Sequence, residues 1–368
     1  MTKIISILSL VLITCVTNAK NNFSQNDASG HSIGITIGPS WALTDLGGGG
    51  RSNPFLRDLD FKSTKFGIGA FYRYTINEWV AVRAQFLYGM LAGSDKNVKG
   101  PNTYNGNYPG PFFRKARNAD FKTHLLQIEA IAELNLKRYD PSASKGDKAR
   151  WAPYLAGGFG MFFFNPYTKG TFSTQNLGSA KYPVRLGGGN VYTAAEINEL
   201  QQYEGEKIKL RKLGASTGST YAPISFNLTG ILGLKFNVTD KIAIFGELWY
   251  NQTFTDNLDD VNGYYPNFST FQGLSPLQKA MTVRYYEIHN TLDPAYAYGD
   301  GSIFNPVSGE GYKRGDDDKD PGDAKGKNDQ FFSVQVGVSI RLEGGGRNNG
   351  FGCGRKNAYN HKFSCPKW

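Results

Sequence analysis

Residues 223–254 read PISFNLTGILGLKFNVTDKIAIFGELWYNQTF, and this stretch decides the fold. In its first arm, residues 224–236, apolar residues or glycine stand at every second position, with mostly polar residues between them. This period-two alternation predicts a strand with one apolar and one polar face. Thr239, Asp240 and Lys241 interrupt the pattern before a second alternating arm begins, so the stretch predicts a hairpin.

The first arm is longer than an ordinary globular strand of about 5–6 residues. It is long enough for the roughly 9–11 residues that a strand needs to cross a bilayer at a tilt. Unpaired backbone groups in hydrocarbon cost several kcal/mol each, so strands in a membrane must form a sheet without edges. The hairpin therefore predicts a closed barrel, provided that the chain supplies enough similar strands.

Six further segments alternate in the same way, at residues 32–40, 66–74, 79–88, 125–137, 154–164 and 330–342. With the two arms of the hairpin they make eight strands. The connections after the second, fourth and sixth strands are short, whereas the long ones span 43–64, 92–120, 165–222 and 255–329. An even number of strands with short turns at one end and long loops at the other is typical of outer-membrane barrels.

Residues 20–342 are therefore predicted to form an all-β, eight-stranded antiparallel transmembrane barrel in contact with outer-membrane lipid. Its long loops are expected to be extracellular and both termini periplasmic. The mean hydropathy of −0.41 is compatible with this fold, because alternation dilutes the apolar residues. Beyond the N-terminus there is no run of 18 apolar residues, which excludes helical membrane spans.

Residues 1–19 resemble an export signal, with Lys3 before an apolar core and a small-residue cleavage site at 17–19. Cys15 lies in a weak lipoprotein-like box, in which Thr14 is unusual, and lipid attachment there is the alternative. Cys353 and Cys365 then remain in the mature chain. In an exported protein this close pair predicts a disulfide, with two free thiols as the alternative.

Residues 343–368 follow the last strand as a basic tail without lipid-facing alternation, so we expect the tail in the periplasm. It is either a solvated extension or a shaped knob that binds a partner or the cell wall. Closure by a disulfide favours the knob, since ordering so short a segment needs a reason. The tail residues predicted to bind the partner are Arg347, Arg355, Lys356, Lys362 and Lys367.

Charged residues stand on the strand faces opposite the lipid. With eight strands, the lumen of a barrel is just filled by side chains. A lone buried charge is heavily penalised, so we interpret the mixed charges as a mutually neutralising ionic plug, with a proton or solute path as the alternative. The predicted lumen network is Arg73, Arg83, Glu129, Glu133, Lys235, Glu247 and Arg341.

Aromatic residues near the predicted strand ends suggest the girdles that form at membrane surfaces. They are Trp79, Tyr88, Tyr154, Trp249 and Tyr250.

Two helix starts are expected inside the long loops. Thr193 and Glu196 form a capping box ahead of an apolar-periodic run through Ile197 and Leu200. The sequence SPLQ at 275–278 predicts a second start, with proline in the first turn.

An acidic stretch at 316–323 has the oxygen-rich chemistry that calcium demands, but it lacks regular ligand spacing and a closing glutamate. A flexible solvated loop is the favoured interpretation. The weak calcium candidates are Asp316, Asp318, Asp320 and Asp323. A second acidic run, 256–260, is expected to cap loop backbone or to pair with basic side chains rather than to bind a ligand.

Catalytic patterns are missing from the sequence. Of the four histidines, only His124 and His289 could meet in the outer loops, and no nucleophile elbow or zinc-site spacing is present. We therefore expect no enzymatic activity, no cofactor and no nucleic-acid partner.

Three stretches together carry a family resemblance. They are FYRY at 71–74, PYLAGGFGMFFFNP at 153–166, and TFTDNLDDV at 253–261 with GYYP at 263–266. The chain resembles the PorG-like family of small outer-membrane barrels of Bacteroidetes, over nearly the whole barrel. The long inserts after the fifth and seventh strands depart from that pattern.

The resemblance implies an accessory role in type IX protein secretion and gliding motility. It implies that the barrel anchors to the outer membrane a periplasmic ring, built of a lipoprotein and its partner protein. The basic tail would be the natural contact. The alternative functions are a passive porin-like or surface ligand-binding barrel of the OmpA type and, from a different class, a surface hydrolase.

Overall fold

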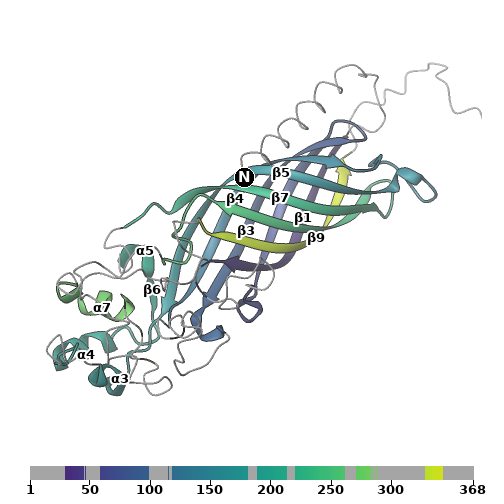
Figure 1. Cartoon of the computed structure of the whole chain (residues 1–368). Coiled ribbons are helices and arrows are strands. Elements are labelled where there is room, and N and C mark those ends of the chain that lie inside the picture. Colours follow the sequence, from purple (N-terminus) through teal and green to yellow (C-terminus); the bar gives the residue numbers. More distant parts are fainter. Residues whose placement is uncertain are drawn as a thin grey trace, which may run out of the picture.

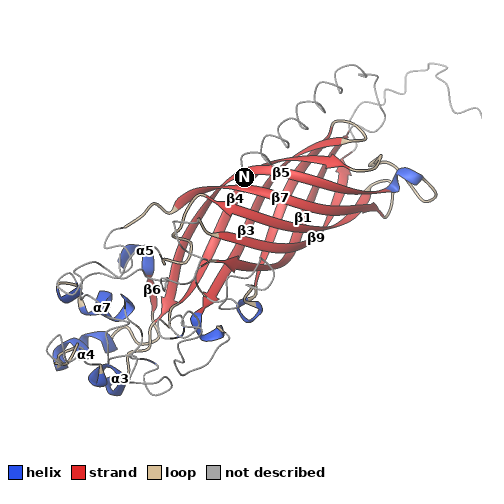
Figure 2. Cartoon of the chain, viewed as in Figure 1, coloured by secondary structure: helices blue, strands red, loops and turns tan. Residues whose placement is uncertain are grey.

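The computed structural model describes residues 30–44, 46, 59–98, 115, 118–180, 189–213, 220–261, 271–282, 284, 287 and 328–342. Eight long strands form one antiparallel barrel (Figures 1 and 2). They are β1 (Gly30–Leu43), β2 (Lys65–Thr75), β3 (Val80–Ser94), β4 (Asp120–Asn135), β5 (Trp151–Lys169), β7 (Ile224–Asn237), β8 (Ile242–Thr253) and β9 (Gln330–Leu342). The predicted fold class is confirmed.

Closure leaves none of these eight strands with a free edge. Each is hydrogen-bonded to its sequence neighbours, β5 pairs with β7, and the first strand pairs with the last. The β1–β9 seam sets His31 opposite Leu342 and Ile37 opposite Val336. The predicted hairpin at residues 223–254 is β7 and β8, which pair from Asn237 opposite Ala243 to Asn227 opposite Thr253.

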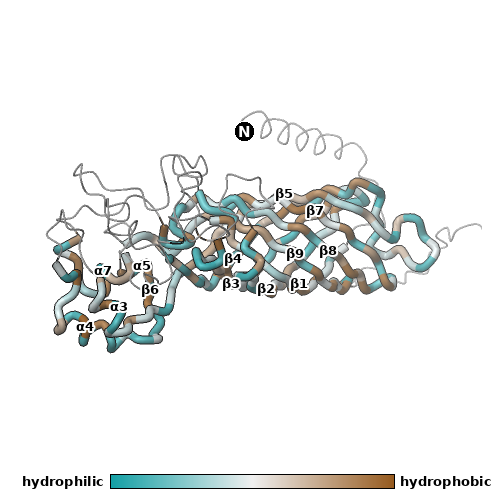
Figure 3. The backbone as a smooth tube through the Cα atoms, turned by 60° about the horizontal axis from the view of Figure 1, so that its bottom comes forward, coloured by the Kyte–Doolittle hydropathy of each residue, from teal (hydrophilic) through white to brown (hydrophobic). Residues whose placement is uncertain are grey.

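Alternation sorts the side chains between the wall and the lumen. Along β7, residues alternate strictly between exposed and buried, with Ile224, Leu232 and Leu234 about half exposed on the outside. The outward positions of the other strands are also dominated by large apolar residues. Hydrophobic and more polar residues accordingly alternate along the strands of the barrel (Figure 3). Because only every second residue faces outward, the wall is apolar although the mean hydropathy of the chain is low.

Four strands run several residues farther toward the long loops than the sequence suggested. β1 ends at Leu43 and not at 40, and β3 ends at Ser94 and not at 88. β4 begins at Asp120 and not at 125, because Phe121 and Thr123 continue the inward-facing pattern and are buried. β5 ends at Lys169 and not at 164, because a short strand, β6 (Lys207–Lys209), pairs with its extension. The predicted loops 92–120 and 165–222 therefore start too early, inside β3 and β5, whereas the predicted end of the first loop at 120 coincides with the start of β4.

Three connections close the short-turn end. In the β2–β3 turn, Asn77 Oδ1 accepts hydrogen bonds from the backbone N–H groups of Trp79 (2.8 Å) and Val80 (2.9 Å). In the β7–β8 turn, Thr239 Oγ1 accepts from Lys241 N and Ile242 N. The β4–β5 connection contains the short helix η4 (Lys148–Arg150) and is tied to the barrel end by Asn237, which donates to the carbonyls of Asp140 and Ala143.

The long loops build a folded cap at the other end (Figures 1 and 2). It contains α3 (Thr174–Ser179), α4 (Ala194–Gln201), β6, α5 (Leu210–Leu213) and α7 (Pro276–Thr282), while η2 (Phe61–Ser63) and η3 (Asp95–Asn97) lie in the first two long loops. The cap has its own apolar core, which is separate from the interior of the barrel. This core includes Phe172, Leu177, Ile197, Leu200, Phe271 and Met281. Among the described residues, no helix is long and apolar enough to span a membrane.

Both predicted helix starts are confirmed. The Thr193 side chain accepts from Glu196 N (3.3 Å), and Glu196 Oε2 accepts from Thr193 N (2.8 Å), which is the reciprocal capping box at the start of α4. Ser275 and Gln278 make the same pair of bonds at the start of α7.

Candidate functional site

The barrel lumen contains a buried ion cluster centred on Glu133 of β4. Arg73 Nε lies 2.9 Å from Glu133 Oε1, Arg83 Nε lies 3.5 Å from the same oxygen, and Lys235 Nζ lies 3.1 Å from Glu133 Oε2. These side chains are at most 3% exposed. One carboxylate thus holds cations from β2, β3 and β7, and ties the opposite walls of the barrel together.

A second carboxylate, Glu247 of β8, completes the cluster. Its Oε1 lies 2.7 Å from Arg83 Nη1 and also accepts a hydrogen bond from the Tyr154 hydroxyl, while its Oε2 accepts one from Trp249 Nε1 at 2.8 Å. Arg83 therefore bridges Glu133 and Glu247, and the two acids together face three cations.

Aromatic rings contact the cations of the cluster. The Lys235 ammonium lies 4.6 Å from the ring centres of both Tyr139 and Tyr154. The Arg73 guanidinium lies 4.9 Å from the centre of the Phe71 ring and 5.4 Å from that of Phe245. Such cation–π contacts stabilise charges that have left water, so the rings both fill the lumen and lower the cost of burying the cations.

Glu129 forms a separate polar layer, on the long-loop side of the ion cluster. Its Oε1 accepts from Gln127 Nε2 (2.6 Å), from Asn227 Nδ2 (2.9 Å) and from the Thr229 hydroxyl. Asn251 joins the layer through Thr229 Oγ1 (2.7 Å). Glu129 makes no ion pair with a described residue, and if ionised it balances the third cation of the cluster.

The lumen network predicted from the sequence thus falls into three parts. Arg73, Arg83, Glu133, Lys235 and Glu247 come together in one cluster, and Glu129 lies in the neighbouring layer. Arg341 is half-buried at the short-turn end of β9, beside Gly30 of the adjacent strand, and no ion pair between described lumen residues includes it.

Large side chains fill the space around these charges. Trp249, Tyr154, Phe162 and Phe164 are among the largest fully buried side chains of the described residues. A cavity of about 20 Å³ beside Gln127, Asn251 and Ser333 has room for about one water molecule. The described lumen is therefore packed, and most of its buried charges are paired with one another.

Two aromatic predictions are wrong. Trp79 and Tyr88 are exposed on the outer wall and Tyr250 is half-buried there, but Tyr154 (0% exposed) and Trp249 (1% exposed) point into the lumen. In the alternation along their strands, both residues stand at inward-facing positions. Both donate a hydrogen bond to the Glu247 carboxylate. The short-turn girdle instead includes Trp151, which is 44% exposed and packs its ring 3.7 Å from Lys137 Nζ.

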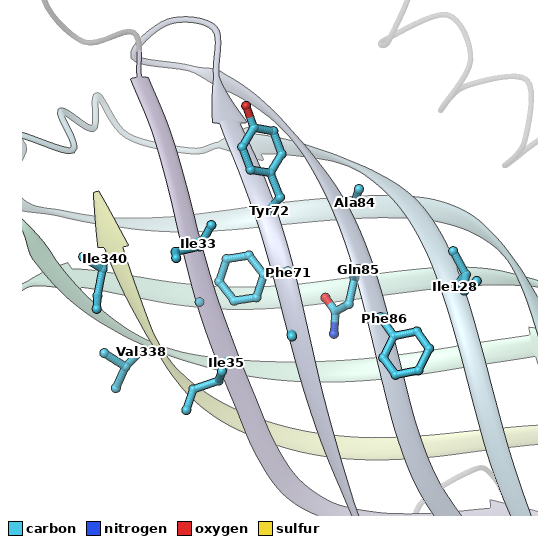
Figure 4. Close-up of a pocket in the computed structure, with 12 residues that line it drawn as sticks. Ile33, Ile35, Phe71, Tyr72, Ala84, Gln85, Phe86, Ile128, Val338 and Ile340 are labelled. Atoms are coloured by element: carbon cyan, nitrogen blue, oxygen red, sulfur yellow. The ribbon is translucent and has the colours of Figure 1, made fainter. Parts of the chain in front are cut away.

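A hollow on the outer wall has a volume of about 690 Å³ and is open (Figure 4). It lies where the small outward residues Ala70 and Ala84 stand between larger ones such as Ile33, Tyr72 and Phe86. Its walls are almost entirely apolar, as expected of a lipid-contacting surface.

Ionic contacts join the long loops to the barrel and connect two helices of the cap. Arg284 is buried, donates to both oxygens of Glu287 at 3.1 Å, donates to Thr168 Oγ1 at 3.2 Å, and pairs with Asp120 at the tip of β4. Lys279 of α7 lies 3.3 Å from Glu196 of α4. No simple sequence pattern pointed to Arg284, because its partners lie far away along the chain.

The acidic run 256–260 has a structural role in the residues described. Asp259 Oδ1 accepts from Val261 N at 2.8 Å, which is backbone capping, and Asp260 Oδ1 accepts from the Tyr221 hydroxyl at 2.8 Å. Burial together with the adjacent Asp260 carboxylate raises the pKa of Tyr221. Asp260 adopts a positive φ of 65°, which is compatible with a tight loop turn.

The remaining predicted sites lie largely outside the described residues. These are the calcium candidates Asp316, Asp318, Asp320 and Asp323, the cysteines Cys353 and Cys365, the basic tail, and His289. His124 lies on the outer wall, with Nδ1 2.7 Å from the Tyr88 hydroxyl. In the described residues, no three His, Cys, Asp or Glu side chains are arranged to hold a metal ion.

No protein-family model and no curated protein sequence matches the chain. Among solved structures, it is similar to Neisserial surface protein A (TM-score 0.33, 10% identity, 85% of this chain and 98% of that one). It is also similar to OprG from Pseudomonas aeruginosa (0.32, 10%, 86% and 98%) and to Ail of Yersinia pestis in complex with a heparin analogue (0.31, 10%, 85% and 99%). These scores are too low to transfer any property from those proteins to this chain.

Proposed function

We propose that this chain is a non-catalytic outer-membrane barrel that anchors a periplasmic assembly and does not conduct solutes. The outward residues of β7 run from Ile224 to Phe236 without a charge. The segment 224–236 has 13 residues. At about 3.3 Å per residue and a tilt of 35–45°, it covers about 30 Å along the barrel axis, which matches the thickness of a hydrocarbon core. Trp79 and Trp151 stand exposed at the short-turn end of that band.

The ion cluster is the observation that carries the proposal. A conducting barrel needs a wetted lumen, whereas Glu133, Arg83 and Lys235 are at most 1% exposed and bind one another. Opening a path would separate buried charges from their partners, at a cost of several kcal/mol for each uncompensated ion. The barrel is thus suited to hold a position in the membrane.

The secretion-ring role is the finer part of the proposal. It is supported by the resemblance to the PorG-like barrels of the type IX machinery and by the basic tail that follows β9. In this view the lipoprotein ring and its partner protein contact Arg347, Arg355, Lys356, Lys362 and Lys367, in a knob closed by Cys353 and Cys365. This role requires both chain ends to lie in the periplasm. It is supported by the short turns, which lie at the end of the barrel where β1 begins and β9 ends.

A surface ligand-binding barrel is the second candidate. The folded cap favours it, because four described helices with a common apolar core form more structure than a mere connection between strands needs. A binding role for the cap is compatible with a sealed lumen, whereas a porin-like role is not.

Co-purification tests the anchoring role. Affinity purification from native membranes in mild detergent should recover periplasmic partners with the intact chain. A chain that lacks residues 344–368 should lose them while its barrel stays folded. A matched chain with the same basic residues replaced by glutamine separates loss of charge from loss of the segment. Unchanged partner recovery and unchanged secretion by both variants would refute the proposal.

A further inference from the structure

Two lysines stand directly opposite each other at the long-loop end of the barrel wall. In the pairing of β5 with β6, Lys169 lies opposite Lys207, and Tyr167 lies opposite Lys209. Directly opposite residues project from the same face of a sheet, with Cβ atoms about 4.5–5.5 Å apart. The alternate residues of this ladder, Thr168 and Ile208, are buried, so the lysines face outward.

A fourth lysine extends the patch across the next strand. Lys122 of β4 lies opposite Tyr167 of β5, on the side away from Lys209. Lys122, Tyr167 and Lys209 therefore form one row across three adjacent strands, about 4.8 Å apart. All four lysines are exposed. We call Lys122, Lys169, Lys207 and Lys209 the lysine crown.

Described acidic residues do not neutralise the positive charge of the lysine crown. Like charges placed directly opposite in a sheet are destabilising. None of the four lysines makes an ion pair with a described acid. Asp120 binds Arg284, and Glu204 accepts a hydrogen bond from Phe172 N. Glu206, next to Lys207 in sequence, is exposed and does not pair with it. The visible compensation is Lys207 Nζ, 5.2 Å from the centre of the Tyr167 ring.

The position of the crown along the barrel indicates what meets it. Moving up the outside of β4, the residues are Ile128 and Leu126, then His124, then Lys122. Lys122 is four residues beyond Leu126, which is about 10 Å along the barrel axis at the usual tilt. His124 stacks between Tyr88 and Tyr167 just below the crown. The outer wall thus presents an apolar band, then an aromatic layer, then lysines. This order matches the hydrocarbon core, the interface and the headgroup region of a membrane.

From this arrangement we infer that the lysine crown binds the phosphate group of an anionic lipid in the leaflet at the long-loop end. Tyr167 would pack against the lipid between Lys122 and Lys209, and Lys169 with Lys207 would hold the phosphate from above. Lipid is the favoured source of the anion because the crown lies on the outer wall, in line with the apolar band. This inference depends on the membrane placement proposed above.

Lipid retention by the full-length barrel tests the inference. The protein in detergent is mixed with equal amounts of phosphatidylglycerol and phosphatidylcholine, and native mass spectrometry counts the lipids that stay bound. The wild type should retain phosphatidylglycerol in excess. Near an anionic surface each basic residue contributes about fivefold in binding, so Lys122→Gln/Lys169→Gln/Lys209→Gln should reduce that excess by at least about tenfold.

The matched control is Lys145→Gln/Lys148→Gln/Lys241→Gln, which removes the same charge from exposed lysines at the short-turn end. It should keep the preference. An equal loss in both variants, or no preference in the wild type, would overturn the inference. The inference would also be overturned if inorganic phosphate or dextran sulfate abolished the preference and no added lipid stayed bound. That result would assign the crown to a soluble anion.

A separate measurement distinguishes failure of the crown from failure of the membrane placement. Each sample is run on SDS gels with and without boiling, because folded transmembrane barrels resist unfolding by SDS. A heat-modifiable barrel without lipid preference refutes the crown and leaves the membrane placement intact. A chain that is not heat-modifiable refutes both.

Discussion

Glu133→Gln is the substitution that most directly probes the lumen. It keeps the size of the side chain and removes the charge that Arg73, Arg83 and Lys235 share at 2.9, 3.5 and 3.1 Å. The three cations then face Glu247 as the remaining carboxylate of the cluster. Because all of these groups are buried, water does not take the place of the lost carboxylate.

The expected cost follows from these distances. At an effective dielectric constant of about 20, one ion pair near 3 Å contributes about 5 kcal/mol of Coulomb energy, most of which offsets the desolvation of the ions. Removing one partner of a buried pair costs about 3–5 kcal/mol net. We expect Glu133→Gln to lower the free energy of unfolding by at least about 3 kcal/mol, a large part of the 5–15 kcal/mol typical of a folded protein.

Urea unfolding in lipid vesicles, followed by tryptophan fluorescence, measures this change, with Trp249 in the lumen as an internal reporter. The control is Glu78→Gln, which breaks the Glu78–Arg138 ion pair at the short-turn end, where Arg138 is 67% exposed. Such a surface pair contributes about 0–1 kcal/mol. A loss below about 1 kcal/mol for Glu133→Gln, or one equal to the control, would refute the view that the cluster holds the barrel together.

Three further predictions concern the seam and the cap. A Cβ added at Gly38 would lie 1.8 Å from the Val334 carbonyl oxygen, whereas one at Gly230 meets nothing within 4 Å. Gly38→Ala should therefore destabilise the barrel by about 1–3 kcal/mol in the same urea assay, with Gly230→Ala as the near-neutral control, and equal effects would contradict the β1–β9 register. Arg284→Ala should speed protease cleavage of the cap without changing the SDS resistance of the barrel, and Lys212→Ala should do neither, since Arg284 joins Asp120, Thr168 and Glu287. Burial opposes ionisation of Glu196, but hydrogen bonds from Thr193 and the ion pair with Lys279 outweigh it and lower its pKa. Because the folded pKa lies below the unfolded value of about 4.3, this stabilisation is present above that pH and is lost as the pH falls through the folded pKa. The protection factors of the α4 amides, which correct for the pH dependence of intrinsic exchange, should fall at acid pH in the wild type. A Glu196→Gln variant with the same fall would contradict this role.

Much of the barrel can be predicted from the sequence, because the alternation of inward and outward side chains along a strand is a local property. Once Ile224 and Phe226 are assigned to the outside, the same rule sends Lys235 and, through the hairpin register, Glu247 and Trp249 to the inside. Trp249 points into the lumen and not toward the predicted membrane girdle, because position along the strand, and not residue type, sets the direction of a side chain. Tyr154 points inward for the same reason.

The contacts of the cap could not be predicted in this way. Helix starts at Thr193 and Ser275 were recognisable, since capping uses residues three positions apart. The packing of Phe172 against residues near Phe271, and the contact of Arg284 with Asp120, join segments whose separation carries no periodic signal. The lysine crown likewise exists only because β6 pairs with an extension of β5 that the alternation pattern did not reveal.

Single-channel recording in planar bilayers tests the central claim most directly, because it asks whether the buried ion cluster closes the lumen. The intact barrel should show no steady conductance, since Glu133, Glu247 and their three cations hold each other in a packed interior. Glu133→Gln, in which the cluster is broken, should show brief openings if it inserts. Steady ohmic currents through the wild-type barrel would contradict the account.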